Sequence, residues 1–249
     1  MKHLIIITAF VLAIANSIYS QDEKRFDFSI RAGLNIGAAA PASIPQEIRA
    51  IEGYSPNFNG SVAGRVAMRM GHETSRWHLV SGISVERKSM TTSARVKSYS
   101  TEIDNGGSHV GGVWTGMVDT RYSAHAITVP LMAGFVVTPR LRLQAGVWAS
   151  ALVSRAFGGK VYDGYLREGD PTGEKIVFAN GSEAEYEFDD QLRSLQCGLM
   201  AGVEYRFCQH WLIGAELSYG LTNIFHADFK TVSFAMYPIF GNLSIGYRL

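Results

Sequence analysis

The chain has 249 residues, of which 47% are hydrophobic and 18% are charged, and its 23 basic and 22 acidic residues nearly balance. This balance argues against general nucleic-acid binding, which requires a basic surface. The length suits a single domain if the fold is a β-barrel.

The first twenty residues predict a secretory signal peptide. Lys2 and His3 precede an apolar run from Leu4 to Ala15, which is too short to span a bilayer, and the segment ends at the small residue Ser20. We therefore predict a signal peptide over residues 1–20 and one domain over residues 21–249. Since no other stretch approaches the 18 or so consecutive apolar residues of a membrane helix, we expect an exported protein or an outer-membrane barrel.

In the first half of the chain, apolar residues alternate with small or polar residues in four predicted strands. These strands run over residues 26–36, 58–70, 77 to about 88, and 122–137. The segments 38–57 and 98–120 are rich in Pro or Gly and are predicted to be loops. Pro130 lies inside the fourth strand and cannot donate to a ladder, so we expect a bulge or a local break there.

The second half contains four more predicted strands. Strand 141–154 is followed by the longest predicted loop, residues 155–190, then by a hairpin of strands 195–207 and 211–220 and by a last strand ending at Leu249. Cys197 and Cys208 lie at opposite ends of one strand, roughly 36 Å apart. This separation is too long for a disulfide, so two unpaired thiols are expected.

The two faces of the hairpin formed by strands 195–207 and 211–220 differ in polarity. One face carries Leu199, Val203 and Leu217, while the other carries small residues and charges such as Glu204. Strands of about 10 residues with this alternation are typical of transmembrane β-barrels, in which the apolar face meets lipid. Long and short connections also alternate along the chain, as they do in these barrels. We predict an all-β, eight-stranded antiparallel up-and-down transmembrane barrel in the outer membrane of a Gram-negative bacterium.

The charged residues on the inner faces then form a polar core. The barrel of eight strands is just wide enough for side chains to fill it, so these groups are expected to pair with one another and to leave no open pore. The predicted barrel-interior polar core comprises Arg31, Arg65, Glu86, Arg142, Glu204, Arg206 and Glu216. A soluble sandwich or a lipocalin would show similar alternation, but its interior would be less polar, and aromatic residues near the strand ends favour a membrane barrel.

Short motifs within the strands resemble the PorT-like outer-membrane β-barrel family. They are Val129-Pro130-Leu131, Leu143-Gln144-Ala145-Gly146, Gly202-Val203-Glu204-Tyr205, Tyr219-Gly220-Leu221-Thr222-Asn223-Ile224 and Gly246-Tyr247-Arg248. The resemblance implies an eight-stranded barrel and, for some members, assistance to a protein-secretion machine. It carries over no catalytic residue.

Two other groups of residues are candidates for chemistry. The acidic run 183–190 offers oxygen ligands for a weak Ca²⁺ site, although a solvated or strand-extension face explains it better. Tyr122, Ser123 and His125 suggest a lipid-hydrolysing site, but Ser123 and His125 lie two apart on one strand face and lack an orienting third group.

We therefore expect a structural or interaction protein that acts through its external loops, without enzymatic activity, cofactor or metal. Its expected partners are outer-membrane lipid and other envelope or secretion-system proteins, not nucleic acid. The alternatives are a PorT-like accessory of protein secretion and, from another class, an outer-membrane lipid-modifying enzyme.

Overall fold

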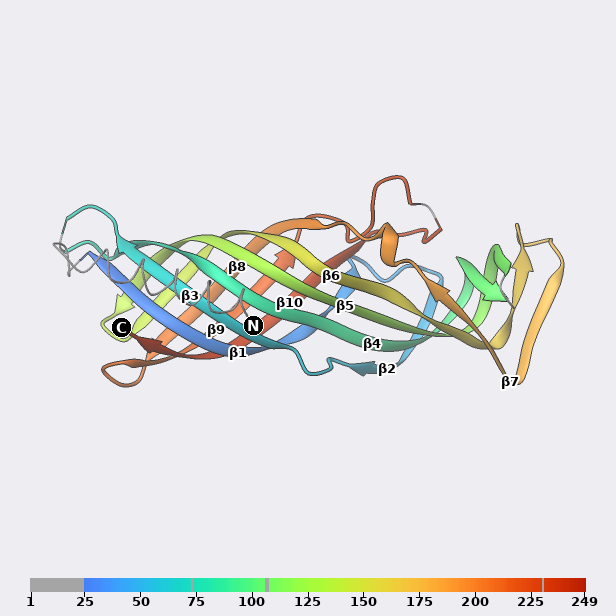
Figure 1. Cartoon of the computed structure of the whole chain (residues 1–249), viewed down its shortest axis with the longest axis horizontal. Helices are drawn as coiled ribbons and strands as arrows, with labels where there is room; N and C mark the ends of the chain where they lie inside the picture. The colour runs from blue at the N-terminus through green and yellow to red at the C-terminus, as the bar shows by residue number, and fades with distance from the viewer. Residues whose placement is uncertain (1–24, 73, 106–107, 230) are drawn as a thin grey trace, which may run out of the picture.

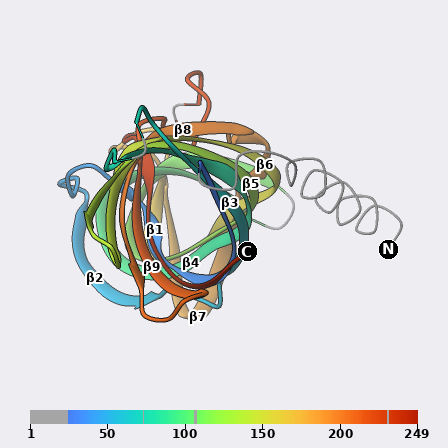
Figure 2. The same cartoon turned by 90° about the vertical axis from the view of Figure 1, so that its left-hand side faces the viewer.

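Eight strands form a closed antiparallel ring, as the view along its axis shows (Figure 2). The computed structural model describes residues 25–249 except 73, 106–107 and 230, so the predicted signal peptide over residues 1–20 lies outside the described residues. The ring strands are β1 (Phe26–Pro41), β3 (Gly60–Arg69), β4 (Trp77–Asn105), β5 (Ser108–Thr138), β6 (Leu141–Glu168), β8 (Leu195–Arg206), β9 (Trp211–Gly220) and β10 (Met236–Arg248). Each strand pairs with the next, and β10 pairs with β1 to close the ring.

The predicted alternation of the two faces is present in the ring. On β9, for example, Ile213 and Leu217 are 48% and 57% exposed, whereas Glu216 between them is 8% exposed. Similar exposed aliphatic rows lie on the other ring strands, including Ile30 on β1, Val62 on β3 and Val129 on β5. An apolar outer surface of this size needs a nonaqueous environment. A charged inner face and an aliphatic outer wall are the arrangement of a membrane barrel.

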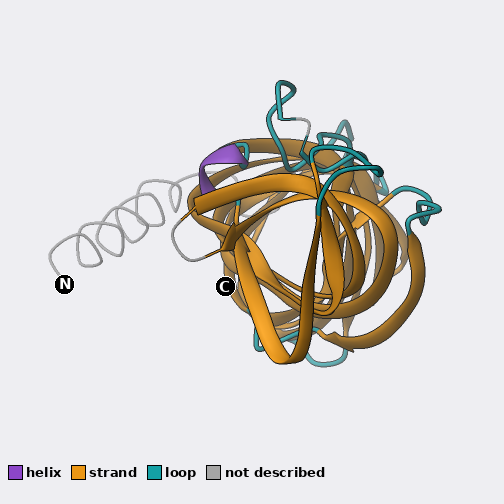
Figure 3. Cartoon of the chain, turned by 90° about the vertical axis from the view of Figure 1, so that its right-hand side faces the viewer, coloured by secondary structure: helices purple, strands orange, loops and turns teal. Residues whose placement is uncertain are grey.

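The two ends of the ring differ. One end, which we call the turn end, carries the short connections 70–76, 139–140 and 207–210 and both ends of the described chain (Figure 1). The other end, the loop end, carries the long connections. Helical structure is limited there to a single 3₁₀ turn, Asp189–Gln191, and none of the described residues belongs to a helix long and apolar enough to cross a bilayer (Figure 3).

The three long loops predicted from the sequence are largely strands, so those predictions were wrong. Within 38–57, β1 continues to Pro41 and a further strand, β2 (Ile48–Ser55), pairs with β4. Residues 98–105 of β4 pair with residues 108–120 of β5, and 155–190 contains the rest of β6 and β7 (Lys175–Glu187). Segment 98–120 is rich in Gly, Ser and Thr, and 38–57 contains Pro41, Pro45 and Pro56, so their alternation is hard to recognise in the sequence. Pairing between strands supplies the regular hydrogen bonds.

As a result, four strands project well past the aliphatic wall. We call this projecting part, residues 91–105, 108–121 and 156–188, the extension; it forms the end on the right of Figure 1. Its strands run in the order β4, β5, β6 and β7, and β7 returns to β4 through the pair Asp104 and Glu185. The extension is therefore a curled sheet, with one side facing inward.

Two smaller predictions concern Pro130 and the cysteines. No register shift occurs at Pro130, although the β4–β5 pairing is interrupted opposite it. The register shifts between β5 and β6 lie at Thr115/Met117, His125/Ala126 and Val136/Thr138, and the shift between β4 and β5 lies at Val96/Tyr99. Cys197 and Cys208 are both exposed and unpaired, as the strand between them requires.

Candidate functional site

The interior near the turn end is filled by ion pairs that join strands across the ring. Arg31 Nη2 on β1 lies 2.5 Å from Glu204 Oε2 on β8, and Arg65 Nη2 on β3 lies 3.1 Å from Glu216 Oε2 on β9. All four side chains are less than 10% exposed. Because charges inside a membrane structure are costly unless they are paired, this reciprocal arrangement is what makes the charged interior tolerable.

At the turn end itself, Arg142 connects two acids. Its Nη2 lies 3.0 Å from Asp27 Oδ2, and its Nη1 lies 3.4 Å from Glu204 Oε1. Arg248 Nε binds the other oxygen of Asp27 at 2.7 Å. The last residues of β10 and the first residues of β1 are thus tied by charge to β6 and β8, strands with which they share no backbone pairing.

A third cluster lies on the loop side of these pairs, around Glu86. Its carboxylate accepts hydrogen bonds from Thr128 Oγ1 at 2.5 Å and Asn35 Nδ2 at 3.1 Å, and it pairs with Lys88 Nζ at 2.9 Å. The Lys88 ammonium also lies 4.9 Å from the centre of the Trp148 ring. Lys88 therefore marks the level at which the interior changes from charged to aromatic.

The structure places the seven predicted core residues in two different settings. Arg31, Arg65, Glu86, Glu204 and Glu216 are buried in the interior, and Arg142 is 12% exposed near the turn end. Arg206 lies at the rim instead, where it donates to the backbone carbonyl of Pro139 and joins none of the salt bridges among the described residues. Lys88 and Asp27 were missed, although both occupy inward positions of their alternating strands, next to the predicted Glu86 and Arg142.

Above Lys88 the inner face is apolar, a change that the sequence analysis did not anticipate. Trp114, Tyr122, Phe157, Phe225 and Phe240 are all at most 2% exposed and belong to one continuous cluster. The ring of Phe157 packs edge-on against Phe225 at 4.9 Å, and Trp114 packs against Phe178 at 5.5 Å. The cluster runs from the upper ring into the extension and closes the barrel.

The space left among the charged groups is small. A cavity lined by Arg31, Arg65, Glu86, Glu216 and neighbouring residues has a volume of about 20 Å³. This is room for about one water molecule. The interior is therefore a packed polar core beneath an apolar plug, and its geometry provides no channel through these residues.

The acidic run 183–190 lies mostly on β7. Glu183, Glu185 and Glu187 point outward and are exposed, while Ala184 and Tyr186 between them are buried. Glu183 binds Lys160 Nζ at 2.7 Å. Among the described residues, no three His, Cys, Asp or Glu side chains are grouped so that they could hold a metal ion. The acidic run is thus a strand face, the explanation that the sequence favoured over a Ca²⁺ site.

Ser123 and His125 lie on the outer surface of β5, opposite Ser89 and Arg87 of β4. In the described part of the chain no hydrogen bond joins them, and no carboxylate orients His125. Tyr122, which precedes Ser123, points into the plug on the opposite face of β5 and is fully buried. The three residues are therefore not assembled into a hydrolytic site.

The sequence comparison places the chain in a family. The profile described as "Outer membrane protein beta-barrel domain" matches residues 19–226, most of the chain. The chain belongs to this family. In bacterial outer-membrane barrels, the short turns face the periplasm and the longer loops face outward. None of the curated proteins matches the chain.

Solved outer-membrane barrels also resemble this family member. Ail, the attachment invasion locus protein of Yersinia pestis, solved with the heparin analogue sucrose octasulfate, is 10% identical with a TM-score of 0.40; the match covers 90% of this chain and 98% of Ail. OprG from Pseudomonas aeruginosa is 11% identical with a TM-score of 0.38, over 90% of this chain and 96% of OprG. Neisserial surface protein A is 12% identical with a TM-score of 0.33, over the same shares of the two chains.

Proposed function

We propose that this protein is a closed outer-membrane barrel that presents the extension to partners outside the cell. The observation that carries the proposal is the projecting sheet itself. From Thr91 to Asn105, β4 continues for 15 residues, which is roughly 50 Å of strand. Membrane anchoring alone needs only about 10 residues per strand.

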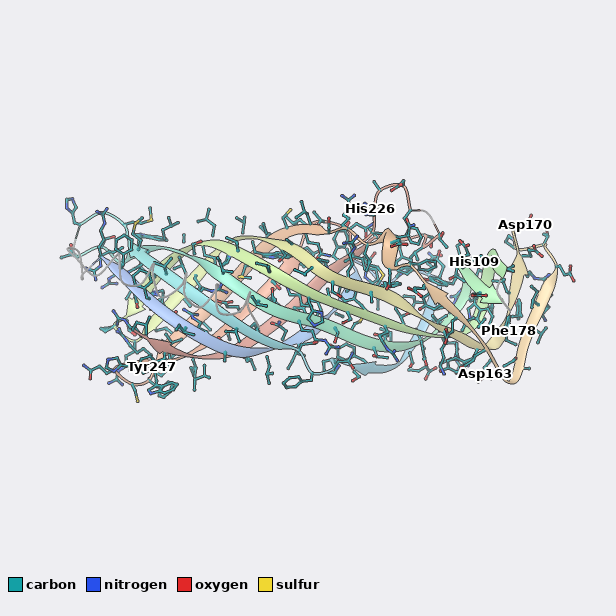
Figure 4. All side chains as sticks on the ribbon, in the orientation of Figure 1. His109, Asp163, Asp170, Phe178, His226 and Tyr247 are labelled. Carbon is teal, nitrogen blue, oxygen red and sulfur yellow. The ribbon has the colours of Figure 1, made fainter. Side chains whose placement is uncertain are left out.

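The extension is a packed sheet and can therefore serve as a rigid binding element. Its inward side is packed with Trp114, Leu166, Phe178 and other buried apolar residues, and Tyr186 donates or accepts a hydrogen bond with Thr120 Oγ1 at 2.7 Å. Because a packed sheet holds its outward side chains in fixed positions, it is better suited to specific recognition than a flexible loop. Figure 4 shows side chains projecting all around this end, where His109, Asp163 and Asp170 are labelled.

The outward surface of the extension is polar and carries both charges. Arg95, Lys97 and Lys175 are exposed, as are Glu183, Glu185 and Glu187 on β7. A binding surface with mixed charges discriminates between partners by electrostatic complementarity. The closed interior supports the same function, since a barrel without a channel contributes through its surface.

Site-specific photocrosslinking in the native cell tests this proposal. A benzoylphenylalanine residue at position 97, 175 or 185 of the extension should give protein adducts of discrete mass after irradiation. The same residue at position 62, on the lipid-facing wall, is the matched control and should give no such adduct. Absence of protein adducts from all three extension positions would count against an interaction role. Planar-bilayer recordings of the purified protein should show no steady conductance, and a reproducible open channel would contradict the closed barrel.

A narrower role as an accessory of protein secretion is supported only by the PorT-like motifs, which lie mainly in the barrel strands. Comparing the secreted proteins of a deletion strain with those of the parent separates this role from surface binding, because an unchanged set of secreted proteins excludes it. Lipid modification has less support, given the separation of Tyr122 from Ser123 and His125. An unchanged lipid A mass spectrum for Ser123→Ala/His125→Ala would agree with a non-enzymatic barrel.

A further inference from the structure

A small pocket lies at the turn end of the barrel interior, beside the β5–β6 turn. Residues from the ends of β1, β5, β6, β8, β9 and β10 line it, and its volume is about 40 Å³. Two lining residues are acidic, Asp27 and Glu204. The basic residues of the lining are all arginines: Arg140, Arg142, Arg206 and Arg248. The pocket therefore carries more positive than negative charge.

Both acids of the pocket already have arginine partners. Asp27 pairs with Arg142 Nη2 at 3.0 Å and with Arg248 Nε at 2.7 Å. Glu204 pairs with Arg142 and, deeper in the barrel, with Arg31. Neither Arg140 nor Arg206 joins a salt bridge among the described residues. These two guanidinium groups are therefore the cations of the pocket that lack a counterion in the described part of the chain.

Backbone pairing holds these two cations next to each other. The Arg206 backbone N–H donates to the Arg140 carbonyl at 2.8 Å, so the two residues lie opposite each other. The Arg206 side chain also donates through Nη2 to the carbonyl of Pro139, which fixes it at the pocket. Like charges directly opposite across a strand pair repel each other. A bound anion would remove this repulsion.

The pocket also has more hydrogen-bond donors than acceptors. Arg142 Nε is shielded from solvent and has no hydrogen-bond partner among the described residues. Buried polar groups normally have a partner. Because arginine provides only donors, the group that would satisfy this nitrogen is an acceptor, and an anionic oxygen also supplies the missing charge.

The surface around the pocket extends its positive charge. Arg25 and Arg76 are exposed at the turn end, and Arg69 there is partly exposed. Together with the arginines of the pocket, they outnumber the described acidic side chains of this end. A surface with one dominant sign of charge attracts partners of the opposite sign. It suits a chain that carries several carboxylates better than a single small ion.

We propose that the pocket binds a carboxylate from an acidic peptide segment of a protein in the periplasm. Short turns of outer-membrane barrels face the periplasm, so the pocket opens toward it. Guanidinium groups bind carboxylates through paired hydrogen bonds. The volume admits a small charged group but no sugar or nucleotide ring. A lipid phosphate fits less well, because the pocket lies within the ring, while Trp211 and Tyr247 face lipid on the outside at this end.

Fluorescence anisotropy with a labelled hexaglutamate peptide tests the pocket. The purified protein in phosphatidylcholine nanodiscs has both ends accessible and no anionic lipid around it. Arg140→Gln/Arg206→Gln removes the two cations that lack an acidic partner. Binding should weaken about fiftyfold, from about fivefold for an exposed ion pair and about tenfold for a charged hydrogen bond at a half-buried site.

Arg140→Gln alone changes an exposed side chain and should weaken binding about fivefold. This single variant keeps the test valid if the double variant no longer shows the heat-dependent gel shift of a folded barrel. Arg95→Gln/Lys97→Gln is the matched control, since it removes the same charge at the loop end. It should bind the peptide within twofold of the wild-type protein.

A labelled hexaglutamine peptide should not bind the wild-type protein, because it carries no carboxylate side chains. The proposal is overturned if hexaglutamate does not bind, if both Arg140 variants bind it like the wild-type protein, or if the control loses as much affinity. It is also overturned if dihexanoylphosphatidylglycerol displaces hexaglutamate at the same concentration, which would make the pocket a site for lipid headgroups.

Discussion

Replacing Glu204 by Gln tests whether the charged interior holds the barrel together. The carboxylate lies 2.5 Å from Arg31 and 3.4 Å from Arg142, and its side chain is 9% exposed. Breaking a buried pair by removing one partner costs roughly 3 to 5 kcal/mol, because it leaves an uncompensated charge. Arg142 keeps Asp27 at 3.0 Å and Arg31 keeps Glu216 at 3.7 Å. We therefore expect the lower limit, about 3 kcal/mol.

The assay is reversible urea unfolding of the protein in lipid vesicles, followed by tryptophan fluorescence. With a denaturant slope of about 1 to 3 kcal/mol/M, the midpoint should fall by about 1 to 3 M. Glu187→Gln, at an exposed position of β7, is the control and should stay within about 0.5 kcal/mol of wild type. In the double variant Arg31→Met/Glu204→Gln, the loss of stability should be smaller than the sum of the losses in the two single variants, because the two side chains form one direct pair. If Glu204→Gln lowers the free energy of unfolding no more than the control does, the view that the ion pairs stabilise the barrel interior is refuted.

Three further predictions concern packing and ionisation. In the barrel wall, a Cβ on Gly146 would lie 2.1 Å from the Leu131 carbonyl oxygen, whereas one on Gly64 would meet nothing within 4 Å; Gly146→Ala should reduce the folded fraction on heat-modifiability gels, and Gly64→Ala should not. Trp114→Ala should cost about 3 to 5 kcal/mol of local stability and make the extension protease-sensitive while the membrane ring stays folded; Val177→Ala, at a side chain that is 60% exposed, should leave protease resistance unchanged. Burial raises the pKa of the Tyr186 phenol well above its usual value of 10.0, so the folded extension holds this proton more tightly than the unfolded chain does. The stabilisation that the protonated Tyr186 phenol gives to the folded extension is complete below pH 10 and is lost as the pH rises above this value. Protease resistance should therefore be constant to about pH 10 and then fall. Tyr186→Phe should make this fall shallower without abolishing it, because burial also raises the pKa of Tyr99; an unchanged profile would show that the phenol is not buried as described.

The sequence by itself determined the membrane-spanning wall. Alternation with a period of two is a local property of a strand, so Ile213, Glu216 and Leu217 reveal their faces without knowledge of any partner. Charged residues on the face opposite a lipid-facing row have only the interior available to them, which is why Arg31, Glu204 and Glu216 could be assigned to it. The number of ring strands followed from counting the alternating segments, and an even count is the one that bacterial outer-membrane barrels have.

Only the tertiary structure decided which charges meet and where the strands end. Arg31 and Glu204 are 173 residues apart, and their contact depends on how the ring closes, which no local pattern encodes. The extension was predicted as loops because its glycines interrupt the alternation, yet pairing between strands makes it a sheet and gathers Trp114, Phe178 and Tyr186 on one side. The register of β4 and β5 likewise sets Arg87 beside His125 on the outer wall, since neighbours across a barrel are fixed by register rather than by distance along the chain.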